Sequence, residues 1–372
     1  MLGRTIASNV LFACALSLFS AAFAGQTYAQ QQPPFDALEG LDPVMLAQGK
    51  EAQGEMNITV MRGQFRYMFA NAANKAAFEQ DPARYEIQLG GHCARMGAPT
   101  RGIPDLFTVY QGRIYIFGSG ECKKQFEAAP QNFFEPEHKS ATTAATPAAL
   151  EKGQALIEQA VAAMGGAQLL DGLRSYQEKN ILTPQVDYSY TLAFPDQARK
   201  DQRFGDYQDA AVINRATGEA SLITRQNSAP LTSQHQQALW QEIGRKPLIL
   251  LRARKQPDFK AAALGAGQAG ETATEQVAVE VGGLAAQLGV EPKTGRILSV
   301  AYTGRGPGSV YGQVAQSFAD FRTVDGLTLP FKVMASFNGQ PWPQRMVTVE
   351  SVVINGKLNP ALFAKPAANK EQ

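Results

Sequence analysis

"QSFADFRTVDGLTLPFKV", residues Gln316 to Val333, alternates apolar and polar side chains on both sides of Asp325-Gly326. Alternation with a period of two is typical of a strand that has one buried face. Asp-Gly between two such runs predicts a tight hairpin turn. The stretch therefore predicts an antiparallel hairpin whose core residues include Phe321, Leu329 and Phe331.

Strand-like segments of the same kind fill most of residues 150–366, between Pro, Asp and Gly turn signals. They are "SYQEKNIL", "DYSYTLAF", "ARKDQRF", "DAAVINR", "EASLITR", "TEQVAVEV", "AAQLGVEP", "RILSVAYTG", "YGQVAQSFADFR", "LTLPFKVMASF" and "RMVTVESVVIN". Asn355-Gly356 is expected to form another hairpin turn. Two short amphipathic helices are expected before the strands, separated at Gly165-Gly166, and a helical stretch is expected over 233–254. We expect a curved antiparallel open β-barrel covered by helices, with its interior filled by default.

The hairpin "QSFADFRTVDGLTLPFKV" and "VESVVINGKLNPALF", Val349 to Phe363, resemble the closing strands of the LolA/LolB-like outer-membrane lipoprotein-sorting superfamily. The "MGG" after the opening helix is similar too. This resemblance implies a half-open barrel, over about residues 150–366, that shields an apolar small molecule, a lipid or a lipoprotein acyl chain. It places no individual ligand-binding residue in this sequence.

A smaller domain is predicted over residues 36–134, where the chain repeats itself. "GQFRYMFANAANKAAFEQDPARY" (63–85) and "GRIYIFGSGECKKQFEAAPQNF" (112–133) align when one residue near the start is deleted. Each reads as a strand-strand-helix unit with a hairpin turn at Gly63 or Gly112 and a helix cap at Asn71 or Ser119. We expect the two units to share one core. An Ala/Thr/Pro-rich linker, residues 135–149, separates this domain from the next, so the whole chain is predicted to be α+β.

"GLDPV" at Gly40, the strand ending at Phe69 and the Phe-x-x-x-Pro-x-x-Tyr pattern ending at Tyr85 resemble a YHS domain. "GGHCA" (90–94) and the second unit resemble exported proteins of that kind. Metal-binding relatives carry cysteines where this chain has Met45, Ala70, Asn74 and Gly118, and only Cys122 falls at such a position. This departure weakens the metal function that the resemblance implies.

Cys93 and Cys122 are the two cysteines that remain once a signal peptide is removed. In an exported chain they are a disulfide candidate, closing a loop of about 30 residues worth about 3 kcal/mol. Alternatively, His92, Cys93, Met96 and Cys122 supply the sulfur and imidazole ligands that Cu(I) or Zn(II) prefers. A third alternative is that the thiols are buried and inert.

The first 29 residues have the layout of a secretory signal peptide, with Arg4 before an apolar run from Val10 to Phe23 and small residues after it. Export to the periplasm is expected, and no later stretch is apolar enough for a transmembrane segment. The balance of 35 basic and 33 acidic residues has no basic stripe, so nucleic-acid binding is not expected.

Three enzyme-like signals have simpler interpretations. "GRGPGS", residues 304–309, lacks the Lys-Ser/Thr of a phosphate loop and reads as a hairpin loop. Ser119 is explained by a helix cap, and His138 and His235 have no evident catalytic partner. No catalytic residue is therefore named, and no cofactor beyond the possible Cu or Zn. The sequence favours a non-catalytic periplasmic protein that binds an apolar ligand; the alternatives are a metal-handling or thiol-redox protein and a scaffold with a filled interior.

Overall fold

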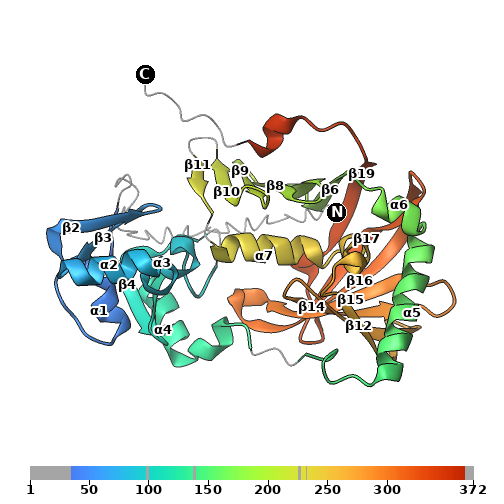
Figure 1. Cartoon of the computed structure of the whole chain (residues 1–372), viewed down its shortest axis with the longest axis horizontal. Coiled ribbons are helices and arrows are strands. Elements are labelled where there is room, and N and C mark those ends of the chain that lie inside the picture. Colours follow the sequence, from blue (N-terminus) through green and yellow to red (C-terminus); the bar gives the residue numbers. More distant parts are fainter. Residues whose placement is uncertain (1–34, 98–99, 137–139, 225–227, 232, 365–372) are drawn as a thin grey trace, which may run out of the picture.

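The computed structural model describes residues 35–97, 100–136, 140–224, 228–231 and 233–364. A small N-terminal unit lies beside a large sheet with helices on one face, and helix α7 (Ser233–Gly244) runs toward the small unit (Figure 1). The expected α+β class is confirmed. The signal peptide expected over residues 1–29 lies outside the described residues.

The N-terminal unit contains the two predicted strand-strand-helix arrangements. The first is β2 (Glu55–Arg62), β3 (Phe65–Phe69) and α2 (Ala72–Gln80). The second is β4 (Ile103–Tyr110), β5 (Arg113–Phe117) and α4 (Gly120–Ala128). Short elements complete it: β1 (Phe35–Asp36), η2 (Leu38–Gly40), α1 (Pro43–Ala47), α3 (Pro82–Tyr85), η3 (Gln88–Gly91) and η4 (Pro130–Phe133). Asn71 and Ser119 accept the backbone N–H of Asn74 and of Cys122, so both predicted caps are confirmed.

The two hairpins have the same register and need no deletion to align. Glu55 pairs with Phe69 and Arg62 with Phe65, while Ile103 pairs with Phe117 and Tyr110 with Arg113. The residue equivalent to Gly63 is therefore Gln111 and not Gly112. The turn begins with a residue at positive φ in both units, φ 57° at Gly63 and 51° at Gln111, and glycine adopts that conformation without steric cost.

The expected single core of this domain is instead two clusters with β5 between them. Ile114 and Ile116 point into the cluster of the first unit, and Tyr115 and Phe117 point into the cluster of the second. Successive side chains of a strand leave on opposite faces, so one strand contributes to both clusters. Phe78 and Phe126 are fully buried, each in its own unit's cluster.

The large sheet has 14 strands, ordered β11-β10-β9-β8-β7-β6-β19-β17-β16-β15-β14-β13-β12, with β18 paired to β17. Their bounds are β6 (Ser175–Thr183), β7 (Val186–Ala193), β8 (Gln197–Phe204), β9 (Tyr207–Asn214), β10 (Glu219–Thr224), β11 (Ser228–Pro230), β12 (Lys260–Ala269), β13 (Thr272–Val281), β14 (Leu284–Val290), β15 (Ile297–Arg305), β16 (Tyr311–Val324), β17 (Leu327–Phe337), β18 (Gln340–Pro341) and β19 (Val347–Ile354). Among the described strands, β11 and β12 end the order without pairing to each other. The sheet is therefore not closed into a barrel.

The hairpin predicted over residues 316–333 is confirmed. Asp325 and Gly326 both have positive φ between β16 and β17. Leu329 and Phe331 are buried, and Phe321 is partly buried against the same core. Asn355-Gly356 was wrongly expected to be a hairpin turn. β19 pairs with β6 and β17, and no strand follows it in the described residues up to 364. Asn355 instead accepts the backbone N–H of Arg174 through its side chain, at the start of β6.

Helices cover one face of the sheet, which we call the inner face. They are α5 (Pro147–Met164), α6 (Ala167–Asp171), α7 and α8 (Pro247–Arg252), followed by η5 (Ala253–Lys255). The two predicted opening helices are confirmed. α5 extends back into residues expected to be linker, because Thr146 caps it and Pro147 occupies its first turn. The helical stretch expected over 233–254 divides before Pro247, which starts α8. The loop over 304–309 joins β15 to β16, and residues 307–309 form the short helix η6.

Strand β12, "KAAALGAGQA", was not predicted, because alanine and glycine are depleted in strands. It forms by pairing with β13 and is held under α5. A Cβ on Gly153 would lie 2.6 Å from the Cα of Ala262, so the small residues on both elements allow this close approach.

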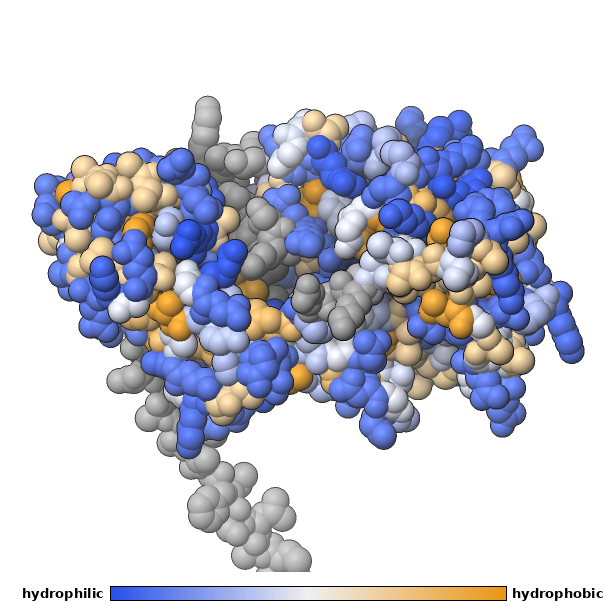
Figure 2. Space-filling model, turned by 60° about the horizontal axis from the view of Figure 1, so that its bottom comes forward, coloured by the Kyte–Doolittle hydropathy of each residue, from blue (hydrophilic) through white to orange (hydrophobic). Residues whose placement is uncertain are grey.

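The N-terminal unit meets the sheet unit through η3, which contacts α7. Val310, after β15, packs on the cluster that contains Cys93. Hydrophilic side chains predominate on the face shown in Figure 2, and the apolar ones form separate small patches. Of the helices within the described ranges, none is both long and apolar enough to cross a membrane.

Candidate functional site

The register of β6 to β10 arranges the inner face in rows that run across the strands. One row is apolar: Tyr176, Leu192, Ala198, Ile213 and Ala220. The next row is Glu178, Tyr190, Lys200, Ala211 and Leu222, and the third is Asn180, Tyr188, Gln202, Asp209 and Thr224. The inner face thus changes from apolar to polar and charged over two rows, and the polar rows face α7.

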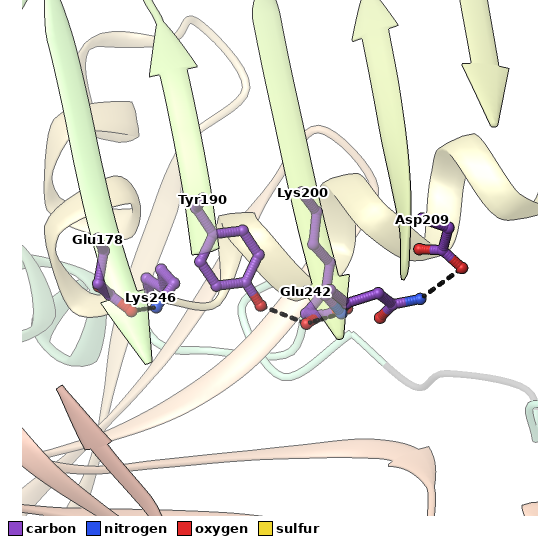
Figure 3. A network of polar contacts seen from close by, with 7 residues as sticks. Glu178, Tyr190, Lys200, Asp209, Glu242 and Lys246 are labelled. Carbon is purple, nitrogen blue, oxygen red and sulfur yellow. Dashed lines mark hydrogen bonds and ion pairs between the residues drawn. The ribbon is translucent and has the colours of Figure 1, made fainter. Parts of the chain in front are cut away.

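Two ion pairs join α7 and the residues after it to this face (Figure 3). The Lys246 ammonium lies 2.7 Å from Glu178 Oε1. Lys200 donates to Glu242 at 2.7 Å, and the Tyr190 hydroxyl donates to the same carboxylate. Glu178 is buried, with 7% of its side chain exposed, whereas Glu242 keeps 39%. The network therefore extends from the sheet interior to solvent.

Aromatic rings lie among these charges. Lys246 Nζ is 4.6 Å from the centroid of the Tyr190 ring, and Lys200 Nζ is 5.3 Å from that of Tyr188. The Arg245 guanidinium is stacked over Tyr302 of β15, 4.1 Å from the ring centroid. These contacts have cation–π geometry. Tyr302 lies on β15, whereas Tyr188 and Tyr190 lie on β7, on the other side of β19 in the strand order. The two residues between α7 and α8, Arg245 and Lys246, therefore contact both parts of the sheet.

The environment shifts the acid–base properties of the network. Burial raises the pKa of Glu242, but the Lys200 ammonium and the Tyr190 hydroxyl outweigh it and lower that pKa to about 2. Burial also raises the pKa of Glu178, but the Lys246 ammonium and the hydrogen bonds that the carboxylate accepts together lower it by more, so the net pKa of that carboxyl is lowered. Burial and the Glu242 charge raise the pKa of Tyr190 well above its usual value. Near neutral pH both carboxylates are charged and the tyrosine is a hydrogen-bond donor.

The inner face is filled in this structure. Leu239 and Ile243 of α7, Leu250 of α8 and Ile157 of α5 all belong to one buried cluster with the sheet. A cavity of only about 10 Å³ lies beneath α5, lined by residues that include Met164 and Ile297. An acyl chain needs far more room, since ligand pockets usually measure about 300–1,000 Å³. A larger hollow, of about 500 Å³, lies at the edge of the sheet, between the start of α5 and β12. Beneath α7, where Leu239 and Ile243 fill the space, a ligand must displace part of the helix.

Buried polar atoms without a hydrogen-bond partner gather where α7 and α8 meet the sheet. Within the described part of the chain they are Asn180 Nδ2 and Oδ1, Asp209 Oδ1, Ser228 Oγ, Trp240 Nε1, Arg245 Nε and Arg252 Nε. Unsatisfied buried polar atoms are rare, and each one calls for a water, a ligand or another conformation. Their concentration makes this region the candidate binding site. The predicted motifs did not identify it, because its residues are scattered from Asn180 to Tyr302 and only the strand register brings them together.

The predicted disulfide candidates are free thiols in the structure. Cys93 is completely buried and Cys122 is partly buried against the same cluster. Because both side chains pack in one cluster, the disulfide stays a prediction; forming it requires the specific geometry of an S–S bond.

The predicted metal ligands do not come together as a set. No three His, Cys, Asp or Glu side chains are grouped as a metal site in the residues that the structure describes. Met96 is 44% exposed, and its sulfur accepts from Arg95. Burial lowers the pKa of His92, which favours the neutral imidazole. A Cu or Zn site formed by His92, Cys93, Met96 and Cys122 stays a prediction without geometric support.

The first unit holds a hydrogen-bond cluster where the YHS resemblance places metal-binding cysteines. The buried Asp42 carboxylate accepts from the backbone N–H of Val44 and of Ala70, at 2.8 Å each, and from the Asn74 amide at 2.7 Å. Asp42 thus joins α1, α2 and the end of β3, a structural role that needs no metal.

Two solved structures are similar to part of this chain. A LolA superfamily protein from Nitrosomonas europaea matches with a TM-score of 0.37 and 11% identity, covering 57% of this chain and 97% of its own. A DUF1329 family protein from Desulfovibrio piger matches with a TM-score of 0.29 and 10% identity, covering 57% and 96%. Both matches cover the C-terminal part of the chain. Neither a protein-family model nor a curated protein matches the sequence.

Proposed function

We propose that this protein is a non-catalytic binding protein whose inner face takes up an apolar or lipid-like ligand beneath α7. The observation that carries the proposal is the cluster of unsatisfied buried polar atoms between α7–α8 and the strands. A helix packs less stably on a sheet when the interface between them is partly polar and some of its polar atoms have no hydrogen bond. A fully apolar interface does not carry that cost.

The ligand is proposed to replace the apolar side of α7. Leu239 and Ile243 are the α7 residues in the buried cluster, and they fill the space that an acyl chain would occupy. Lifting α7 exposes the apolar row that ends at Ile213 and Ala220, next to the polar row of Glu178 and Lys200. Such a surface suits an amphiphile, with a tail on the first row and a polar end on the second.

The location proposed with this function is the periplasm, and the proposed ligand is a lipid or a lipoprotein acyl chain. The signal-peptide layout of residues 1–29 supports export. In the same proposal, residues 36–134 form a YHS-like domain, supported by the repeat of strand-strand-helix units. The mass of the protein from a periplasmic fraction tests export, since cleavage shortens the chain, and an uncut cytoplasmic product would contradict it.

Binding can be tested with the two tryptophans of the chain, Trp240 and Trp342. In a Trp342→Phe variant, Trp240 of α7 is the single reporter. Titration with a fluorescent fatty acid should give saturable binding and a change in Trp240 emission. Organic extraction of the native protein followed by mass spectrometry should release lipid. Empty preparations together with no saturable binding would overturn the proposal.

A matched pair of variants tests whether α7 must move. Ile243→Ala removes buried contacts of α7 and lowers the cost of lifting it, because such truncations cost about 2–5 kcal/mol. The apparent affinity for the probe should rise about tenfold or more, since it depends on the fraction of molecules in the competent state. Leu250→Ala on α8 is the control in the same cluster. Equal effects of both variants would indicate general loosening of the core instead.

A further inference from the structure

Arg245 is a cation beside the inner-face network that has no carboxylate partner among the described residues. Lys246 is paired with Glu178, and Lys200 with Glu242. Arg245 lies beside them, and among the described residues it forms no ion pair within 4.0 Å, while its Nε has no hydrogen-bond partner. Glu135 and Glu242 act on it only through their more distant charges.

The surroundings of Arg245 make its positive charge energetically costly when no anion is bound. Its guanidinium is half-buried over Tyr302, and burial lowers its pKa. A buried charge is normally paired, because taking it out of water costs several kcal/mol unless an opposite charge or hydrogen bonds compensate. Arginine is also the side chain best suited to hold a carboxylate or phosphate through two parallel hydrogen bonds.

Arg245 stands where a ligand's polar end would lie. It occupies the short joint between α7 and α8, directly after Gly244, whose Cβ position would be 2.8 Å from Leu284 of β14. If α7 lifts about this joint, as the proposed function requires, this close approach keeps Arg245 near the sheet. The hydroxyls of Tyr188 and Tyr302 both have raised pKa values through burial, so they stay protonated and can donate to an anion.

We propose that the ligand is an amphiphile with an anionic headgroup, a carboxylate or a phosphate, and that Arg245 binds this headgroup. The inference rests on the proposed function, because it assigns the polar end of the same ligand. It predicts a preference among headgroups that a purely apolar face would not show.

The test compares amphiphiles that share a twelve-carbon chain, about as long as the hydrocarbon region of one lipid leaflet is thick. They are dodecanoate, dodecyl phosphate, the neutral alcohol and the trimethylammonium cation. Calorimetric titration of the full chain should give anionic amphiphiles about ten- to a hundredfold tighter binding than the alcohol, as a charge-assisted hydrogen bond provides. Inorganic phosphate alone should bind at least about a hundredfold more weakly than dodecyl phosphate, because it lacks the buried methylenes.

Variants locate the preference. Arg245→Gln should abolish it by weakening the binding of both anionic amphiphiles to about that of the alcohol, and Arg245→Lys should retain part of it. Arg252→Gln is the matched control: Arg252 is also partly buried, has an unsatisfied Nε and stacks over a ring, that of Phe194 at 4.2 Å, but its nearby carboxylate is Asp171. This variant should keep the preference. Circular dichroism confirms that each variant is folded, and Arg245→Lys carries the test if Arg245→Gln is not.

The outcomes separate the two proposals. No binding of any amphiphile overturns the proposed function. Equal binding of all headgroups leaves that function standing and overturns the anionic headgroup. An anionic preference that survives in Arg245→Gln, or disappears in Arg252→Gln, overturns the assignment to Arg245. Phosphate that binds as tightly as dodecyl phosphate shows a small-anion site and overturns the amphiphile.

Discussion

The buried pair of Glu178 and Lys246 gives the sharpest test of how α7 is held. Lys246→Met removes the ammonium and keeps most of the side-chain length, so packing of the stem changes little. Glu178, with 7% of its side chain exposed, then loses its cation and keeps the neutral Tyr176 hydroxyl as a donor. Removing one partner of a buried pair costs about 3–5 kcal/mol, and the 24% exposure of Lys246 favours the lower end. We expect the free energy of unfolding to fall by about 3 kcal/mol.

The assay is urea unfolding at pH 7, followed by tryptophan fluorescence. Both tryptophans lie in the sheet unit, at Trp240 and Trp342, so the signal reports on that unit. The double variant Glu178→Gln, Lys246→Met should recover most of the loss, because no uncompensated charge remains.

A neighbouring surface pair supplies the control. Lys179 is next along β6 on the opposite face and pairs with Glu350 at 2.5 Å, with both side chains about half exposed. Lys179→Met should cost less than about 1 kcal/mol. If Lys246→Met costs no more than Lys179→Met, the reasoning about burial is refuted.

Three further results are expected. Glu242 has its pKa lowered from 4.5 to about 2. The stability that this carboxylate contributes is therefore present above pH 4.5 and lost as the pH falls toward 2. Acid titration of Trp240 emission should show this transition, and Glu242→Gln should remove it. Gly153→Val should lower the melting temperature by several degrees through overpacking against β12, whereas the exposed Ala155→Val should change it little; equal shifts would contradict the close approach. In native protein Cys122 should be alkylated before the fully buried Cys93, while a mass deficit of about two hydrogens without alkylation would instead establish the disulfide.

Local patterns were sufficient for most of the secondary structure. The alternation around Asp325-Gly326 predicted a hairpin because the turn and both strands lie within one short segment. The caps at Asn71 and Ser119 were equally local, since each side chain binds a backbone N–H three residues later. Such features depend on neighbouring residues, so the sequence specifies them directly.

Predictions failed where the outcome depended on distant partners. β12 is a strand because β13 pairs with it and α5 packs on it, although its alanines and glycines do not favour a strand. Asn355-Gly356 has residues that favour a hairpin turn, but β19 pairs with β6 and β17, and the described residues after it form no strand. That the sheet is open was expected, and among the described strands its ends β11 and β12 do not pair with each other.

The sequence by itself determined the α+β class, the repeated N-terminal units and nearly all the strands, because hydrophobic periodicity, turn residues and caps act over a few positions. Only the tertiary structure decided that Glu178, Lys200, Glu242 and Lys246 form one network and that Arg245 stands beside it without a carboxylate. Whether a charge is paired and how deeply it is buried depend on its neighbours in the folded structure. The residues that create them here come from β6, from β8, and from the end of α7 with the two residues after it, so their spacing along the chain does not predict that they meet.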